Sequence, residues 1–452
     1  MLRIANASAF WGDQPDAAAR VLAALPDLDY LTLDYLAEVS LSIMAAQRER
    51  DPEAGYARDF VGVVGSLVPL WRAGSGCRIV TNAGGLNAEG CARAVLATLA
   101  AAGLWRMRVA IVTGDDVLHH VRDGAPLTNL ETGEPIDGIR PRVATANAYT
   151  GAAPIAEALK AGADIVITGR TADPSLTVGP CIVHYDWKPD DWNRIAGATV
   201  AGHLIECGTQ ACGGFSTDWL DVPEPENIGY PVAEISEDGS CVITKPPGTG
   251  GKVNVQTVKE QLLYEIGDPG KYLSPDATVS FLTIRVSEEG ADRVSVSGAT
   301  GKPPPESLKV SATYRDGYRA HGMITIFGHD AVRKARRAGE AVIKRLANAG
   351  FTYDRHLVEC LGTGASVRGL VSRMSDTHLL ETVLRISVAD PSREAVERFT
   401  KEIAPLVTCG PQGVTGYAHG RASVVPVFGY WPTLMPRALV RTSWKFVNGG
   451  VA

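Results

Sequence analysis

Two side chains that could carry out chemistry follow a short apolar run near the middle of the chain. Residues 165–167 are all β-branched, which is typical of a strand buried on both faces of a parallel sheet. Arg170 and Asp173 come next, and Pro174 suits the first turn of a helix for which Asp173 would be the N-cap. A guanidinium can clamp a carboxylate, and a carboxylate can act as a general acid or base. A plainer interpretation is that Arg170 and Asp173 pair with each other and cap the helix.

The same arrangement recurs along the first half of the chain. Strand-like runs at 2–5, 77–81, 107–113 and 142–146 also end in small or polar residues, and helical segments follow most of them. Ligands bind beyond the carboxyl ends of the strands in such sheets. If these runs lie in one parallel sheet, one cleft holds Asn82, Asp115, Asp116, Asn147, Arg170 and Asp173.

The first candidate chemistry is that of a lyase or hydratase acting on a carboxylate or an acyl-CoA. Asp115, Asp116 and Asp173 supply carboxylates, and repulsion between neighbouring carboxylates would raise the pKa of one of them. Arg170 would clamp the substrate, and Glu206 is an additional acid. Since the guanidinium is expected to touch substrate, Arg170→Ala should abolish activity with little loss of stability.

A second candidate is a thiol-dependent hydrolase or acyl transferase. Cys207 or Cys212 would be the nucleophile, with His203 one helical turn before Cys207. The glycine-rich segment that follows could offer backbone amides to an oxyanion. However, Cys207 is expected at a helix C-terminus, where the helix dipole raises a thiol pKa, so this chemistry ranks second. The plainer interpretation is a buried, inert cysteine.

Two further possibilities complete the comparison. One possibility is a metal site, since His203, Glu206 and Cys207 share one side of a predicted helix and Asp115 with Asp116 could bind Mg²⁺. However, the sequence has no HExxH motif or tight Cys/His group, so no metal ligand is assigned. The chain could also be a ligand-binding subunit without catalytic activity. The assigned catalytic residues are Asp115, Asp116, Arg170, Asp173 and Cys207, and the assigned substrate-binding residues are Asn82, Gly84, Gly85, Asn147, Thr168, Gly213 and Gly214.

Composition excludes several classes of protein. The net charge is −6 and no Lys/Arg-rich run occurs, which argues against a nucleic-acid partner. No segment reaches the ~20 apolar residues of a membrane span, and the first residues do not resemble a signal peptide, so a cytoplasmic protein is expected. The eight cysteines form no CxxC pair, which disfavours disulfides and a zinc ribbon.

The pattern of the 452 residues predicts an α/β fold in three parts. Residues 1–220 form a parallel-sheet α/β domain with the cleft. Residues 221–350 add a hairpin at Asp238-Gly239, a helix and antiparallel strands at 279–286, 293–297, 309–314 and 323–327. Residues 351–452 form a small α+β region. In this arrangement Ile4, Ile79, Ile111 and Ile165 lie in one sheet.

Several stretches also carry a family resemblance. They are NAGGLN at 82–87, VTGDDV at 112–117, GRTADPSL at 169–176, IECGTQACGGFS at 205–216, the long segment 249–276 and GPQGVTG at 410–416. In this order they resemble the acyclic terpene utilisation family AtuA. The resemblance implies breakdown of branched, terpenoid-like acids as CoA thioesters, with CoA part of the small-molecule substrate. Family members carry or accompany a small ferredoxin-like module whose sequence signature is missing here, so the resemblance implies that the chain works with a separate small subunit or without one. A homo-oligomer is also expected.

Overall fold

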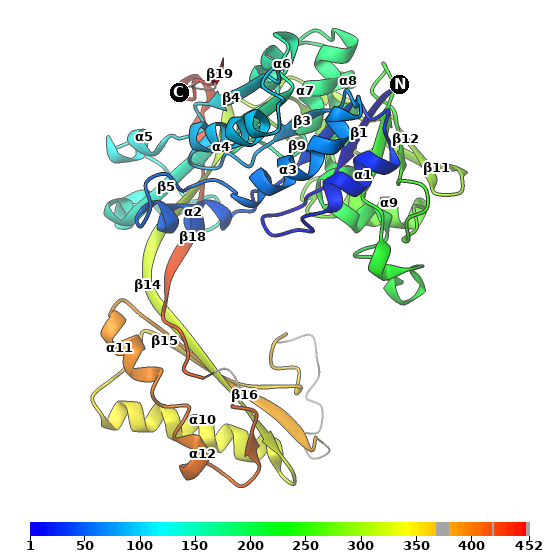
Figure 1. Ribbon diagram of the computed structural model, residues 1–452. Helices are drawn as coiled ribbons and strands as arrows, with labels where there is room; N and C mark the ends of the chain where they lie inside the picture. Colours follow the sequence, from blue (N-terminus) through cyan, green and yellow to red (C-terminus); the bar gives the residue numbers. More distant parts are fainter. Residues whose placement is uncertain (368–378, 418–419, 449–452) are drawn as a thin grey trace. The chain divides into compact units, whose positions relative to one another are not determined.

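A ten-stranded mixed sheet organises the first of the two units seen in the computed structural model, which describes residues 1–367, 379–417 and 420–448 (Figure 1). The first unit comprises Met1–Thr313 together with the C-terminal segment from Tyr430 onward, and the second comprises Tyr314–Gly429. The boundaries near residues 220 and 350, which rest on composition, stay a prediction.

Five parallel strands form the core of the large sheet. Their spatial order is β1 (Leu2–Asn6), β2 (Tyr30–Leu33), β3 (Arg78–Thr81), β6 (Ile165–Thr168) and β4 (Val109–Thr113). Nearly all of their residues are buried, as short β-branched runs covered on both faces require. The prediction that Ile4, Ile79, Ile111 and Ile165 share one sheet is confirmed.

Helices cover both faces of this core because successive strand residues point to opposite sides. Ile79, Ile165 and Ile167 pack in one apolar cluster with α1 (Ala17–Ala24), α3 (Asp59–Arg72) and α4 (Ala88–Ala101). Val80 and Val166 pack on the other face with α6 (Ala153–Lys160), α7 (Ser175–Tyr185) and α8 (Trp192–Glu206). Three further helices of this unit are α2 (Ser40–Arg48), α5 (Leu118–Arg122) and α9 (Val255–Leu263).

Antiparallel strands extend the sheet at both edges. On one side β7 (Val232–Ile235), β8 (Cys241–Thr244), β12 (Arg293–Ser297) and β11 (Arg285–Gly290) follow β1, and on the other β19 (Ser443–Phe446) pairs with β4. The turn between β7 and β8 contains Gly239 at φ +86°, which confirms the predicted hairpin. The fold is therefore α/β with a parallel core, and antiparallel sheets dominate later in the chain.

Four of the expected strands are wrong. Residues 142–146 do not join the parallel sheet, because β5 (Val143–Ala148) pairs instead with β14 (Ser307–Phe327). Polar side chains interrupt the apolar pattern of β5. The hydroxyl groups of Thr145 in β5 and Thr313 in β14 form a hydrogen bond of 2.7 Å. Segments 309–314 and 323–327 belong to the single long β14, whose polar middle looked like a loop. The expected strand 279–286 is divided between β10 (Thr278–Ser280) and β11, and β10 forms a small sheet with β9 (Tyr272–Leu273) and β13 (Thr300–Lys302).

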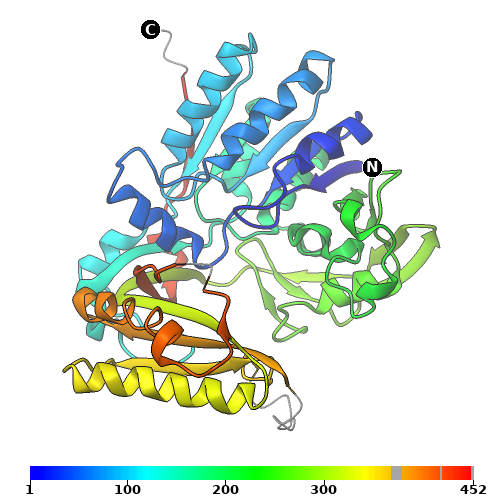
Figure 2. The ribbon, with the colours of Figure 1, turned by 60° about the horizontal axis from the view of Figure 1, so that its bottom comes forward.

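The second unit consists of an antiparallel sheet with helices packed on it (Figure 2). Its sheet order is β15 (Arg355–Leu361), β16 (Glu381–Asp390), β14 and β17 (Val414–Thr415), and β18 (Val425–Pro436) also pairs with β14. The amphipathic α10 (Ala331–Asn348) buries Val342 and Leu346 against this sheet, and α11 (Arg393–Phe399) and α12 (Leu406–Cys409) complete the unit. In the described part of the chain, no helix is long and apolar enough to cross a membrane.

Candidate active site

A cavity of about 410 Å³ opens beyond the carboxyl ends of the parallel strands. Its walls come from the segments after β1, β2 and β6 and from the segments after α8 and α9. The volume is in the range of small-molecule sites. Of the predicted residues, Arg170, Asp173, Glu206, Cys207 and Gly214 line it, whereas Asn82, Gly84, Gly85, Asp115, Asp116, Asn147, Thr168 and Gly213 lie outside the lining.

The cavity is strongly acidic. Its lining contains one arginine, Arg170, and six carboxyl groups, which belong to Asp13, Asp34, Glu38, Asp173, Glu206 and Glu265. The Arg170 side chain is 3% exposed and the Asp173 side chain 32%. The carboxylate of this pair is therefore more accessible to a ligand than the guanidinium.

Arg170 is held by the protein on several sides. Its Nη1 lies 3.0 Å from Asp173 Oδ1 and donates to the carbonyl oxygen of Leu36. The guanidinium also stacks on the Tyr149 ring, with Cζ 4.0 Å from the ring centroid. Burial opposes its charge, but Asp173 and Tyr149 more than compensate and raise its pKa. This geometry suits a group that orders the surrounding carboxylates better than a clamp for a substrate.

Asp34 is a site residue that the sequence reasoning missed. It follows β2 directly, and its Oδ1 accepts hydrogen bonds from Asn82 Nδ2 at 2.7 Å and from the Leu36 backbone N–H at 3.1 Å. Burial, followed by the nearby charge of Asp173, raises the pKa of Asp34 well above its ordinary value, although Arg170 and Asn82 oppose the shift. The signal was present, since this aspartate ends an apolar strand as the predicted residues do.

Asn82 supports Asp34 from behind the cavity. Its side chain is fully buried, and its Oδ1 accepts a hydrogen bond from the Tyr35 backbone N–H at 2.6 Å. With both ends of the amide engaged, Asn82 has a fixed orientation. The structure therefore places it as a positioning residue.

Asp115 and Asn147 act on the turn that carries Arg170. Asp115 Oδ2 accepts hydrogen bonds from Asn147 Nδ2 and from the Arg170 backbone N–H, each at 2.8 Å. Burial raises the pKa of Asp115 to about 6. A Cβ on Gly169 would lie 2.5 Å from both Asp115 carboxylate oxygens, so the absence of a side chain allows this approach. Asp116 is exposed and accepts a hydrogen bond from the Leu118 N–H at the start of α5.

The predicted glycine and threonine positions serve close packing. A Cβ on Gly84 would lie 2.5 Å from the Thr168 carbonyl oxygen, and one on Gly85, which has φ +49°, would collide with the Met44 sulfur. Thr168 is buried, and its hydroxyl donates to the Gly169 carbonyl oxygen at 2.9 Å. These residues let the strand ends approach one another.

The expectation that Asp173 is an N-cap is wrong. Helix α7 begins at Ser175, with Pro174 at the cap position and no side-chain hydrogen bond to the first turn. The Asp173 carboxylate is drawn to Arg170 instead. An ion pair with a buried guanidinium outcompetes a single hydrogen bond to a backbone amide.

The thiol candidate lies in an unfavourable electrostatic environment. Cys207 follows the end of α8 and is partly exposed, but burial and the Glu206 carboxylate raise its pKa. Glu206 shares a 3.0 Å hydrogen bond with His203 Nδ1, and burial raises the pKa of Glu206. Cys212 is fully buried. A thiolate is therefore disfavoured here.

The glycine-rich segment after α8 has no free amides at the predicted positions. The Gly213 N–H donates to Gln210 O at 3.0 Å and the Gly214 N–H to Thr209 O at 2.9 Å. An oxyanion would have to displace these bonds. Among the described residues, no group of three or more His, Cys, Asp or Glu side chains is arranged to hold a metal ion, and this includes His203, Glu206 and Cys207.

Comparison with known proteins identifies the family of the chain. The family model described as acyclic terpene utilisation family protein AtuA matches residues 2–446, which is nearly the whole chain. Neither the curated proteins nor the solved structures gave a match to this sequence.

Proposed function

The chain belongs to the acyclic terpene utilisation family AtuA, and from this premise we propose that it is a lyase or hydratase acting on a branched, terpenoid-like carboxylate or its CoA thioester. The observation that carries the proposal is the placement of Asp34 and Asp173 around one buried guanidinium at the edge of the acidic cavity. Two carboxyl groups in different environments are what acid/base catalysis requires.

The two carboxyl groups have distinct roles in this proposal. Asp173 pairs with Arg170 as a carboxylate and is partly exposed, so it serves as the general base that removes a proton from the substrate. Asp34 keeps its proton to higher pH and serves as the general acid that protonates the leaving hydroxyl group. Water addition reverses these two transfers. Glu206 is a third carboxyl group within the same cavity.

The charge of the cavity limits which part of the substrate enters it. The lining has more carboxyl groups than cationic groups, which disfavours an anion, so the reacting segment of the substrate is uncharged. A thioester with its neighbouring carbons meets this condition. The charged groups of CoA, or a free carboxylate, then lie outside the cavity. In this proposal Arg170 does not bind the substrate but holds Asp34 and Asp173 in position.

Cys207 is kept as a second candidate because it lines the same cavity and is partly exposed. A hydrolase or acyl transferase would form a thioester on its sulfur. The raised thiol pKa weighs against this chemistry. A ligand-binding subunit without activity of its own, working with a small ferredoxin-like partner or as a homo-oligomer, is the third candidate.

The test is a turnover assay on the purified chain. Branched 2-enoyl-CoA and 3-hydroxyacyl-CoA substrates are supplied, and water addition or loss is followed by mass spectrometry. We expect Asp173→Asn and Asp34→Asn each to lower kcat by about 100-fold or more, while Cys207→Ser keeps most of the activity. An inactive Cys207→Ser beside an active Asp173→Asn would establish the thiol route. Absence of turnover until a small partner subunit is added would favour the binding-subunit candidate.

A further inference from the structure

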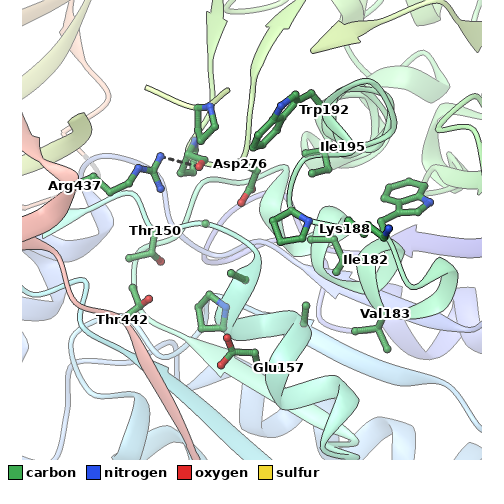
Figure 3. A pocket seen from close by; sticks show the side chains of 18 of the residues that line it. Thr150, Glu157, Ile182, Val183, Lys188, Trp192, Ile195, Asp276, Arg437 and Thr442 are labelled. Atoms are coloured by element: carbon green, nitrogen blue, oxygen red, sulfur yellow. Dashed lines mark hydrogen bonds between the residues drawn. The ribbon is translucent and has the colours of Figure 1, made fainter. Parts of the chain in front are cut away.

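A second cavity, of about 470 Å³, lies in the first unit and shares no lining residue with the acidic one (Figure 3). It runs between α6 and α7 and is closed on one side by residues of α8. In Figure 3 the labelled side chains Ile182, Val183, Ile195 and Trp192 gather at one end of the cavity. The size again suits a small molecule.

The walls at this end are apolar. Ile182 and Val183 of α7 face Ile195 and Trp192 of α8 across the cavity. Trp187 also lines it, and its one polar atom, Nε1, already donates to Glu237 O at 3.1 Å, so its ring is left for apolar contact. A hydrocarbon chain loses contact with water here without leaving a buried polar group unpaired.

The opposite end of the cavity carries an arginine, Arg437, that forms no ion pair with the described residues. Arg437 donates from Nη2 to Pro275 O at 2.8 Å and from Nε to Pro305 O at 3.2 Å, while Nη1 has no partner among the described residues. No carboxylate of the described chain lies within ion-pair distance of Arg437. The charge of the nearby Asp276 acts on Arg437 without forming an ion pair, because the Asp276 carboxylate accepts from the Ala152 N–H at 2.7 Å and from Ser175 Oγ at 2.5 Å.

The other charges of the lining are accounted for. Glu157 accepts from Trp444 Nε1 at 3.0 Å, and Lys160 pairs with Asp186 at 3.3 Å. Lys188 is exposed to water at the rim. Arg437 is therefore the half-buried charge that an incoming anion would satisfy.

We propose that this cavity is a binding site for an amphipathic monocarboxylate, with the carboxylate on Arg437 Nη1 and the hydrocarbon chain along the wall formed by Ile182, Val183, Trp192 and Ile195. The proposal stands independently of the function assigned to the acidic cavity. Thr150 lines the second cavity, and its hydroxyl donates to the Arg170 carbonyl oxygen at 3.0 Å. The second cavity is thus bordered by a residue that supports the turn holding Arg170.

The experiment measures binding of decanoate to the full chain by titration calorimetry, below the concentration at which decanoate forms micelles. We expect saturable binding, with decanoate preferred over 1-decanol by about tenfold or more because of the charge-assisted hydrogen bond. Arg437→Gln should lower the affinity for decanoate to about the affinity for 1-decanol, because the charge-assisted hydrogen bond is lost. Val183→Trp should weaken both by about tenfold or more, since the indole fills the apolar end.

His184→Trp is the matched control, because it adds the same side chain to the same helix at an exposed position outside the lining. It should bind decanoate as the unmodified chain does. Thermal unfolding by circular dichroism identifies any variant that fails to fold, and because Arg437→Gln and Val183→Trp act at opposite ends of the cavity, either one alone tests the proposal. The proposal would be overturned if both variants bound decanoate as tightly as the unmodified chain does, or if the unmodified chain showed no saturable binding. If Val183→Trp changed the sedimentation coefficient of the protein but left decanoate binding unchanged, the proposal would also be overturned. The cavity would then belong to a subunit interface.

Discussion

Asn82 donates from its side-chain amide to Asp34 Oδ1 at 2.7 Å, across the ends of the neighbouring strands β2 and β3. The same amide accepts from the Tyr35 backbone N–H, so a residue outside the cavity holds a carboxyl group inside it. The proposed acid is therefore positioned by the sheet itself. This relationship, and others like it around Arg170, lead to four predictions.

Replacing Asn82 with alanine removes both hydrogen bonds and leaves a buried backbone N–H unpaired. We expect a loss of about 1–3 kcal/mol in the free energy of unfolding, together with a further rise in the pKa of Asp34. Chemical denaturation measures the first effect and the pH dependence of turnover the second. Asn448→Ala, at an exposed position, is the control and should leave both unchanged. An Asn82→Ala chain as stable as the unmodified one would contradict the positioning role.

Arg170→Ala should destabilise the protein, contrary to the expectation from sequence that the fold would tolerate it. The side chain is 3% exposed, and its removal leaves Asp34 and Asp173 facing each other without a cation. Breaking a buried ion pair on one side costs about 3–5 kcal/mol. Denaturant titration checks this value. The double variant Arg170→Ala with Asp173→Ala should regain part of the loss, and no recovery would show that the ion pair is not the cause.

Asp115 should make the stability of the protein depend on mildly acidic pH. Burial raises its folded-state pKa from 3.8 to about 6, so the folded state binds this proton more tightly than the unfolded state. Its contribution to stability is complete below about pH 4 and is lost as the pH rises to 6. Asp115→Asn should therefore lose less stability than the unmodified chain between pH 4 and 6. Asp190→Asn, at an exposed position whose charge does not act on Asp115, should follow the unmodified chain, and identical curves for all three would contradict the prediction.

Gly169→Ala should lower both stability and activity. The new methyl group meets the Asp115 carboxylate at 2.5 Å and must displace it from the Arg170 backbone N–H. Overpacking of this kind costs about 1–3 kcal/mol. Gly62→Ala is the control, because its Cβ would have open space within α3 and should stabilise the chain by about 0.5–1 kcal/mol. Thermal unfolding and turnover of the two variants separate a local clash from a general effect of adding a methyl group.

Local patterns were sufficient for much of the fold. The apolar runs at Ile79–Thr81 and Ile165–Thr168, and the Asp238-Gly239 turn, are determined by residues close together in the sequence, so the parallel core and the hairpin were predictable. β5 was misplaced because strand propensity does not identify the partner strand. The polar middle of β14 was missed because its side chains do not have the apolar pattern of a strand. Hydrogen bonding of β14 to β16 on one side and to β18 on the other keeps this segment extended.

The sequence by itself determined that polar residues follow the parallel strands and that Arg170 and Asp173 lie together on one turn, because both follow from strand alternation and short-range spacing. Only the tertiary structure decided what these residues do. Asp34 and Arg170 are more than 130 positions apart, and their charges interact because burial in one cavity removes the water that would screen them. The same burial ties Arg170 to Leu36 and Asp173, assigns Asp115 and Asn82 to supporting roles, and raises the thiol pKa of Cys207.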